Sequence, residues 1–223
     1  MNAFQIVRDF EKALCEYTGA PLAVAVNSCS NALFLALKYQ HLNGMAITIP
    51  CKTYCSVPMQ IIHAGGVPKF ENLEWNGIYQ LKPLNIYDSA RLFTSNMWKN
   101  LFYNVCNRVG PQLVGEGDFP MICVSFHWSK TLGIQQGGAI LHANAVADRW
   151  FRKARFDGRT EGIPPKDDTG MITGYHMYMS PEIAAEGLVR MMHLPKHNLP
   201  LPNDDYPDLS KIKACGGEPD EEC

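Results

Sequence analysis

The sequence predicts an α/β protein built as a three-layer αβα sandwich with a mostly parallel central sheet. Short apolar runs typical of buried strands alternate along the chain with longer runs whose apolar residues recur at helical spacing. Because a helix between two strands carries the chain back to the starting edge of the sheet, this alternation favours parallel pairing. Small polar residues follow several of the strands, and ligands collect at the carboxyl ends of strands in such folds.

Composition and charge narrow the class of protein. The chain of 223 residues is 46% hydrophobic and 19% charged, which is enough apolar material for one large domain or two small ones. Its formal net charge is -2 and it has no run of Lys or Arg, so neither nucleic acid nor a membrane surface is an expected partner. Residues 1–17 resemble neither a signal peptide nor a membrane span, which favours a cytoplasmic protein.

The eight cysteines are scattered along the chain, several of them inside apolar runs where a reduced thiol behaves as a small hydrophobe. No pair of Cys-x-x-Cys elements occurs, and Cys51 and Cys55 have no second pair at the spacing of a zinc site. No metal is therefore expected. The cysteines of the tail, Cys215 and Cys223, are expected to be exposed thiols.

Each element follows from its own apolar pattern. Apolar residues from Phe4 to Tyr17 recur every three or four positions and predict a helix that ends at Gly19. An apolar strand over 22–26 then runs through a polar turn into a helix over 32–39. Later runs predict strands at 46–50, 67–70, 84–87, 122–124 and 139–141, a helix that ends before Gly65 and Gly66, and a helix over 180–193.

The polar turn at 27–31 has two interpretations, which can hold together. A turn between a strand and a helix leaves backbone N–H groups free at the positive end of the helix dipole, and this arrangement suits a phosphate. Ser28 or Ser30 could equally serve as an ordinary helix cap, as such residues usually do.

The stretch with the most chemical character is Ser125–Gly133, followed by the glycine pair Gly137 and Gly138. It brings Lys130 into a turn after a strand, and a lysine near apolar surface has a lowered pKa and can form imines with carbonyl groups. Taken alone, Lys130 is better explained as a loop lysine that points into water. Asp88 also follows a strand, where an aspartate is more often a helix cap than a catalytic acid.

Together these segments resemble the DegT/DnrJ/EryC/StrS family of pyridoxal-phosphate-dependent sugar aminotransferases, which have fold type I. The resemblance covers about residues 10–192, and the lysine block is its most specific part. It implies that the cofactor is pyridoxal 5'-phosphate. Five blocks carry it in the family's order: Asn27–Leu33, Pro50–Tyr54, Tyr87–Arg91, Ser125–Gly133 with Gly137–Ile140, and Gly174–Ser180.

The resemblance assigns roles to individual residues. Lys130 would hold the cofactor as a Schiff base and then move a proton, and Asp88 would pair with the pyridinium nitrogen, so these two are the expected catalytic residues. Tyr54 would lie on the cofactor ring. The full cofactor-binding set implied by the resemblance is Cys29, Ser30, Asn31, Tyr54, Asp88, Arg91, Ser125, Lys130 and His176.

Four positions depart from the family pattern. Cys29 and Ser30, expected with Ser125 at the phosphate, stand where relatives usually have glycine and threonine. Arg91 replaces Gln or His near the ring hydroxyl, where its charge could stabilise a phenolate or reach a substrate anion. His176 replaces an asparagine that in relatives reaches the phosphate of the neighbouring subunit. Imidazole can also donate there, so the resemblance implies a homodimer with shared active sites.

Two differences in length bear on domain organisation. Residues 1–193 are expected to form the cofactor-binding large domain, and residues 194–223 a Pro-rich and acidic tail, because prolines at this density forbid a regular helix or central strand. The smaller C-terminal domain of the family is therefore expected to be absent, which leaves an open crevice or one walled by another chain. The stretch between Tyr54 and Asp88 is also short, as if one α/β unit were lost.

Arg152, Arg155 and Arg159 follow the glycine pair on a predicted helix. They could contact an anionic substrate such as a nucleotide diphosphate. A solvated helix face is the more common explanation of such a run of charges.

The preferred hypothesis is an aminotransferase that moves an amino group from a donor such as glutamate to a keto group, with a nucleotide-linked sugar as the favoured acceptor. One alternative is a catalytically reduced relative that serves as an accessory or scaffold protein. Loss of the small domain favours that alternative, whereas retention of Lys130 and Asp88 argues against it. Another reaction of the same cofactor, such as elimination or racemisation, also stays open because the cofactor supplies the chemistry common to all of them.

Overall fold

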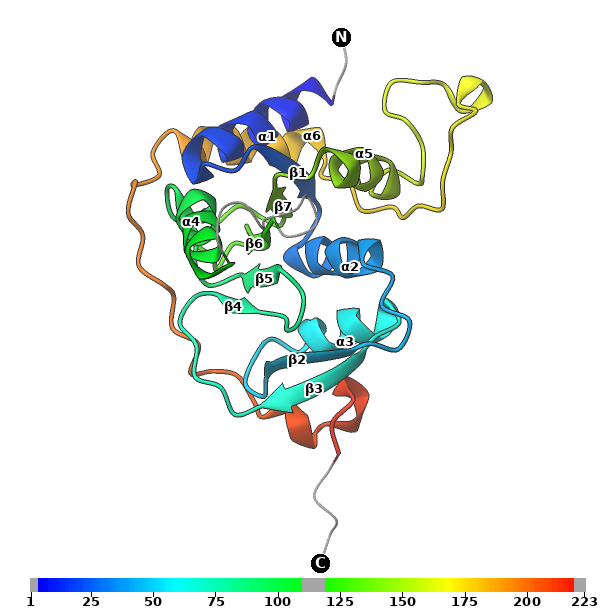
Figure 1. Cartoon of the computed structure of the whole chain (residues 1–223). Coiled ribbons are helices and arrows are strands. Elements are labelled where there is room, and N and C mark those ends of the chain that lie inside the picture. Colours follow the sequence, from blue (N-terminus) through cyan, green and yellow to red (C-terminus); the bar gives the residue numbers. More distant parts are fainter. Residues whose placement is uncertain (1–3, 110–118, 219–223) are drawn as a thin grey trace, which may run out of the picture.

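A five-stranded sheet runs through the middle of the protein (Figure 1). The structure is a computed structural model that describes residues 4–109 and 119–218. In the order in which they pair, the strands are β1 (Leu22–Val26), β7 (Gly138–His142), β6 (Met121–Ser125), β5 (Ile86–Ser89) and β4 (Tyr79–Gln80).

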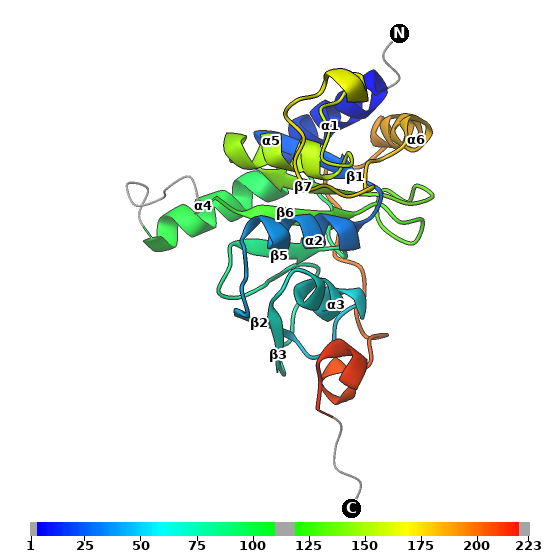
Figure 2. The ribbon, with the colours of Figure 1, turned by 90° about the vertical axis from the view of Figure 1, so that its right-hand side faces the viewer.

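Helices cover both faces of this sheet, so the predicted three-layer αβα arrangement is confirmed (Figure 2). Along β1, Val24 and Val26 pack into the core on one face while Ala23 and Ala25 pack on the other, because successive side chains of a strand point in opposite directions. On the second face, α1 and α6 lie side by side (Figures 1 and 2). The first face carries α2 (Cys29–Tyr39) and α5 (Ala145–Ala154), and the second carries α1 (Gln5–Thr18), α4 (Met97–Val109) and α6 (Pro181–Met191).

The α/β class is confirmed, but the prediction of a mostly parallel sheet is wrong. Among the described strands of this sheet, β5 and β6 pair in parallel, whereas β1 with β7, β6 with β7, and β4 with β5 pair antiparallel. The reason lies in the connections. Residues 126–137 join β6 to β7 and residues 81–85 join β4 to β5, and neither connection contains a helix. A connection without a crossover helix returns the chain in the opposite direction.

A smaller sheet of two strands lies beside the first. Its strands β2 (Ala46–Pro50) and β3 (Val67–Glu71) are parallel and are joined by α3 (Ser56–His63), the βαβ unit that the sequence predicts. Thr48 and Lys82 exchange backbone hydrogen bonds of 2.8 and 3.1 Å, which ties β2 to the connection after β4. The stretch between Tyr54 and Asp88 thus contains α3, β3 and β4.

Local residues explain where the helices begin and end. Gly19 takes a left-handed backbone conformation with φ 74° and its N–H donates to Cys15 O, so α1 ends where the sequence predicts. The side chain of Asn144 accepts hydrogen bonds from the N–H groups of Val146 and Ala147 and so caps α5. No helix within residues 4–109 and 119–218 is long and apolar enough to cross a membrane.

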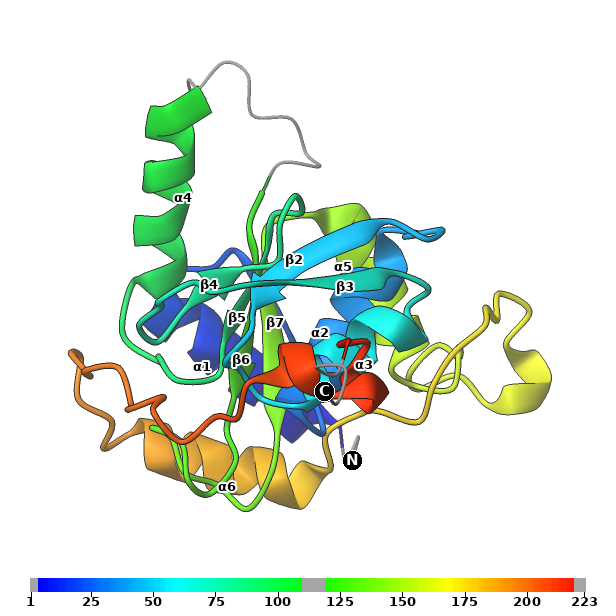
Figure 3. The same ribbon diagram turned by 90° about the horizontal axis from the view of Figure 1, so that it is seen from below.

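After α6 the chain crosses the molecule to the end where β2, β3 and α3 lie (Figures 1 and 3). Residues 194–207 contain neither helix nor strand, as their prolines predict. The segment is bonded to the body of the protein, since Leu209 N donates to Cys51 O across 2.9 Å. Two short 3-10 turns follow, and the second packs against α3. Cys215 is buried there, so the prediction of an exposed thiol is wrong for it, and Cys223 lies outside the described residues.

The arginines of the predicted charged helix face serve the packing of the fold. Arg155 is fully buried, and its Nη1 donates to Glu11 Oε1 and to a backbone carbonyl of β1. Arg152 Nη1 donates to Glu11 Oε2 across 2.7 Å. The guanidinium of Arg159 lies over the ring of Phe156. These bonds join α5 to α1 and β1, so the interpretation of a solvated face is wrong for Arg155.

Candidate active site

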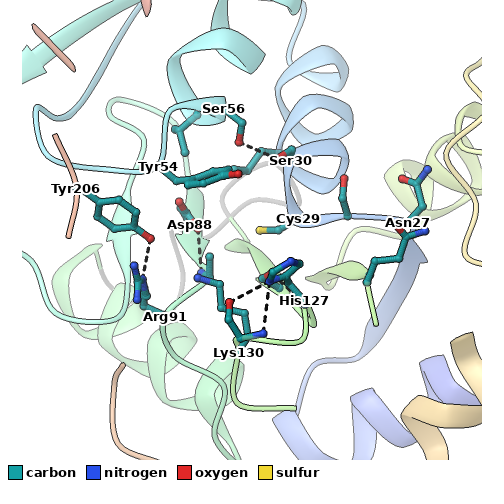
Figure 4. A pocket seen from close by; sticks show the side chains of 18 of the residues that line it. Asn27, Cys29, Ser30, Tyr54, Ser56, Asp88, Arg91, His127, Lys130 and Tyr206 are labelled. Atoms are coloured by element: carbon teal, nitrogen blue, oxygen red, sulfur yellow. Dashed lines mark hydrogen bonds between the residues drawn. The ribbon is translucent and has the colours of Figure 1, made fainter. Parts of the chain in front are cut away.

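The carboxyl ends of β1, β5 and β6 surround a cavity of about 350 Å³ (Figure 4). The antiparallel β7 starts at the same edge of the sheet, and Gly137, the residue just before it, also lines the cavity. Asn31 and His176, two of the residues predicted for the site, do not line it. The other seven predicted residues do: Cys29, Ser30, Tyr54, Asp88, Arg91, Ser125 and Lys130.

The first turn of α2 forms one wall of the cavity. Ser28 Oγ accepts a hydrogen bond from Asn31 N across 3.1 Å, so the predicted helix cap is confirmed. The N–H groups of Cys29 and Ser30 have no acceptor within the described part of the chain, and they lie at the positive end of the helix dipole. Such N–H groups are well placed to bind an anion such as phosphate.

Gly138 allows this wall to form. A Cβ at position 138 would lie 2.5 Å from the backbone nitrogen of Cys29, which is closer than real Cβ contacts come. β7 can therefore start directly against the turn only because residue 138 is glycine. This close approach explains why the second residue of the predicted glycine pair is glycine.

Asn31 braces the turn instead of lining the cavity. Its Nδ2 donates to Asn27 Oδ1 across 2.6 Å. Asn27 itself lines the cavity, and its backbone N–H donates to Met177 O across 2.9 Å. Asn31 is thus placed to act on a ligand through Asn27 and not by direct contact.

Asp88 is buried at the floor of the cavity, and both of its carboxylate oxygens accept hydrogen bonds. Oδ1 accepts from Ala90 N across 2.9 Å, and Oδ2 accepts from Tyr79 Oη across 2.8 Å. Tyr79 Oη is in turn 2.7 Å from Thr53 Oγ1. Burial raises the pKa of Asp88 above the usual carboxyl range, although the bonds from Ala90 and Tyr79 oppose this shift.

Lys130 enters the same cavity from the turn after β6, and its backbone N–H donates to His127 O across 2.8 Å. Burial lowers the pKa of its ammonium group, and the nearby positive charge of Arg91 lowers it further. The negative charge of Asp88 acts in the opposite direction. Lys130 is half buried among charged groups, so the interpretation of a loop lysine that points into water is wrong.

Arg91 stands at the mouth of the cavity, and two residues of the C-terminal segment hold it. Its Nε donates to Tyr206 Oη across 2.7 Å (Figure 4). Its Nη2 donates to Asp205 Oδ1 across 2.6 Å. Both partners line the cavity. The ring of Tyr54 is exposed at the same mouth, with its centroid 6.4 Å from that of Tyr206.

His176 lies outside the cavity and faces solvent. Its side chain is 72% exposed, and its Nδ1 is 3.1 Å from Asp157 Oδ2. Within one chain it has no access to the cavity wall formed by α2. A role at a phosphate would therefore require a second copy of the chain.

Sequence reasoning missed several residues of the site. Ser56, at the start of α3, is hydrogen-bonded through Oγ to Ser30 Oγ across 2.6 Å and adds a hydroxyl to the wall. Its place just after the Tyr54 block was a usable signal. Asp205 and Tyr206 had no such signal, because they lie more than one hundred positions along the chain from Arg91. Tyr79 had none because its strand, β4, spans two residues.

Several solved structures have the same fold as this chain. The fold is shared with NtdA from Bacillus subtilis with bound cofactor PMP (TM-score 0.65, 21% identity) and with Helicobacter pylori PseC, an aminotransferase involved in the biosynthesis of pseudoaminic acid (TM-score 0.63, 17% identity). A third such structure is S. venezuelae DesV in complex with a ketimine intermediate (TM-score 0.63, 21% identity). The matches to NtdA, PseC and DesV cover 85%, 86% and 85% of this chain but 48%, 58% and 57% of those chains. The chain therefore has the fold of the fold-type-I aminotransferases and spans about half the length of these structures.

The sequence comparison points to one family. Residues 2–90 match the model of the DegT/DnrJ/EryC1/StrS aminotransferase family. Over 72 residues the chain is 44% identical to the spore coat polysaccharide biosynthesis protein SpsC of Bacillus subtilis (strain 168). That match covers 31% of this chain and 18% of SpsC. The resemblance to this family is thereby confirmed.

Proposed function

We propose that this chain acts as a pyridoxal-phosphate-dependent aminotransferase that moves an amino group from an amino-acid donor to a keto group, with a nucleotide-linked sugar as the acceptor. The observation that carries the proposal is one cavity lined by Lys130, by the buried Asp88 and by the first turn of α2. A sugar acceptor is supported by two relatives. SpsC is a polysaccharide biosynthesis protein, and PseC acts in the biosynthesis of pseudoaminic acid.

The residues of the cavity fit this cofactor, which is a phosphorylated pyridine aldehyde. The N–H groups at the start of α2 and the hydroxyls of Ser30 and Ser125 would donate to its phosphate. Lys130 offers an amine for the aldehyde, and Asp88 offers a carboxylate for the ring nitrogen. When bound, the cofactor supplies an electron sink that stabilises a carbanion at the amine-bearing carbon.

The environment of each residue suits its proposed task. Because the pKa of Lys130 is lowered, its Nζ is neutral at a lower pH than an ordinary lysine, and a neutral amine can both add to a carbonyl and accept a proton. Asp88 is fixed by hydrogen bonds to both oxygens, so its carboxylate would hold a proton on the ring nitrogen in a constant position. Tyr54 at the mouth would cover the ring and exclude water.

A cofactor-uptake experiment tests the proposal. The purified full chain is incubated with pyridoxal phosphate and then passed through a desalting column. We expect visible absorbance from the lysine-bound aldehyde to stay with the protein, and Lys130→Ala to abolish it. Adding an amino-acid donor should then discharge the visible band. A colourless protein that retains no cofactor would sink the proposal.

The same experiment separates the alternatives. A catalytically reduced accessory protein would retain the cofactor and its colour, but no amino donor would discharge the band. Lys69→Ala, a loss of one exposed lysine on β3 away from the cavity, is the matched control and should leave the absorbance unchanged.

We also propose that residues 1–193 form the cofactor-binding domain and that the protein is a cytoplasmic homodimer with shared active sites. The exposure of His176 supports sharing, because its imidazole could reach a phosphate only in a second copy. Mixing Lys130→Ala with His176→Ala chains should restore part of the activity that each variant lacks. No restoration, in mixtures shown to exchange subunits, would contradict a shared site.

A further inference from the structure

Two residues of the C-terminal segment line the cavity, although they lie more than one hundred positions after Arg91 along the chain. Asp205 and Tyr206 both bond to the guanidinium of Arg91, and Figure 4 shows the Tyr206 hydroxyl and Arg91 pointing toward each other. The C-terminal segment is thus a wall of the candidate active site.

Bonds on both sides hold this wall in place. Before it, Leu201 N donates to Arg91 O across 2.8 Å, and after it Leu209 N donates to Cys51 O across 2.9 Å. The ring of Tyr206 stacks on Trp75 with centroids 6.1 Å apart and an angle of 18° between the planes. Tyr206 is therefore a positioning residue that fixes the Nε side of the Arg91 guanidinium.

Asp205, unlike Tyr206, holds Arg91 through a charged and mostly exposed side chain. Its side chain is 66% exposed, whereas that of Arg91 is 14% exposed. The planar guanidinium is suited to bind a carboxylate through its N–H groups, and the Asp205 carboxylate already accepts from Nη2. An incoming carboxylate must displace Asp205 to make the same bond, and it meets the negative charge of Asp205 as it approaches.

We propose that Asp205 is a specificity-determining residue, which occupies the anion-binding side of Arg91 and so selects against ligands that present a carboxylate there. The inference rests on the proposed function, since it assumes that substrates enter this cavity. The mouth of the cavity would then favour an uncharged, hydroxyl-rich group, such as a sugar carries, over the second carboxylate of a dicarboxylic donor.

Equilibrium binding of glutarate, a simple dicarboxylate, tests this inference by calorimetry on the full chain without added cofactor. We expect Asp205→Asn to tighten glutarate binding about fivefold. Asp204→Asn removes the same charge from the next residue, an exposed aspartate that does not line the cavity, and should leave the affinity unchanged. Glutaramide, the uncharged diamide, should bind both variants and the parent chain alike.

Arg91 supplies the decisive control. In an Arg91→Gln background, Asp205→Asn should no longer tighten glutarate binding, because the anion-binding side is gone. An equal gain with Asp204→Asn, a gain that survives Arg91→Gln, or no gain with Asp205→Asn would overturn the inference. Glutarate binding needs neither cofactor nor turnover, so a failed transamination assay would count against the proposed function and leave this result standing.

Discussion

The hydroxyl of Tyr79 donates a hydrogen bond to Oδ2 of Asp88 across 2.8 Å, and the two residues face each other in the register between β4 and β5. The second carboxylate oxygen accepts from Ala90 N. Because the pair is buried, each lost bond would leave a polar atom without water to replace it. A strand of two residues thus fixes the carboxylate at the floor of the cavity.

Tyr79→Phe should therefore destabilise the protein. The change removes the donor to Asp88 and the partner of Thr53 while keeping the ring, and the expected loss is about 2 kcal/mol in the free energy of unfolding. Denaturant unfolding followed by circular dichroism measures it. Tyr103→Phe, which removes a hydroxyl from an exposed tyrosine, is the control and should stay within about 0.5 kcal/mol. Equal effects of the two changes would contradict the importance of the buried bond.

Asp88→Asn should stabilise the protein at neutral pH. Burial raises the pKa of Asp88, so the folded protein binds this proton more tightly than the unfolded chain does. This tighter binding adds to the free energy of unfolding. The addition is fully present below the pKa that Asp88 has in the unfolded chain, and it is lost as the pH rises through the pKa that Asp88 has in the folded protein. The amide cannot ionise, and it can donate to Tyr79 while Tyr79 donates to Thr53.

The measurement is the free energy of unfolding of the two proteins at a series of pH values. We expect the advantage of Asp88→Asn to be largest at neutral pH and to vanish toward acid pH. Asp204→Asn, which removes one exposed carboxylate that does not line the cavity, is the control for the loss of a negative charge. A difference that is constant with pH would show that the buried carboxyl does not ionise differently on unfolding.

Arg91 and Asp88 should move the titration of Lys130 in opposite directions. The positive charge of Arg91 lowers the pKa of Lys130 and the negative charge of Asp88 raises it, while burial lowers it most. Arg91→Gln should therefore shift the midpoint upward, and Asp88→Asn should shift it downward. Pulse acetylation across a pH series, with the Lys130 peptide quantified by mass spectrometry, gives each midpoint. Shifts in the same direction would contradict the electrostatic explanation.

How much of the site the sequence predicts depends on how local each signal is. Ser30 and Lys130 follow within five residues of the buried strands β1 and β6, and the prediction of a parallel sheet places them at one edge. They do share that edge, because β1 and β6 each pair antiparallel with β7 and therefore run in the same direction. The wrong prediction of a mostly parallel sheet therefore did not change which of these residues were predicted to lie together.

The residues that were missed have no local pattern. β4 spans two residues, which is too short for an alternating signal, so Tyr79 could not be assigned to a strand. Asp205 and Tyr206 lie in a segment whose prolines exclude regular structure. That exclusion says nothing about where the chain packs, and the bonds to Arg91 exist only once the segment has crossed the molecule.

The buried carboxylate of Glu11 connects three elements of the fold. Its side chain is 5% exposed, and it accepts hydrogen bonds from Arg152, Arg155 and the backbone N–H of Ala25. One carboxylate on α1 thus joins α5 and β1. Glu11→Ala leaves the buried guanidinium of Arg155 without this counter-charge, and removing one member of a buried ion pair costs about 3 to 5 kcal/mol.

We expect Glu11→Ala to lower the free energy of unfolding by about 3 kcal/mol, measured by chemical denaturation at neutral pH. Glu16→Ala on the same helix is the matched control, because the Glu16 side chain is 69% exposed and lies 3.9 Å from a single partner, Lys12. Exposed pairs of this kind contribute about 0.5 kcal/mol. A loss for Glu11→Ala no larger than for Glu16→Ala would mean that Arg155 finds other partners, and that the contacts of α1 with α6, and not this carboxylate, hold the helix on the sheet.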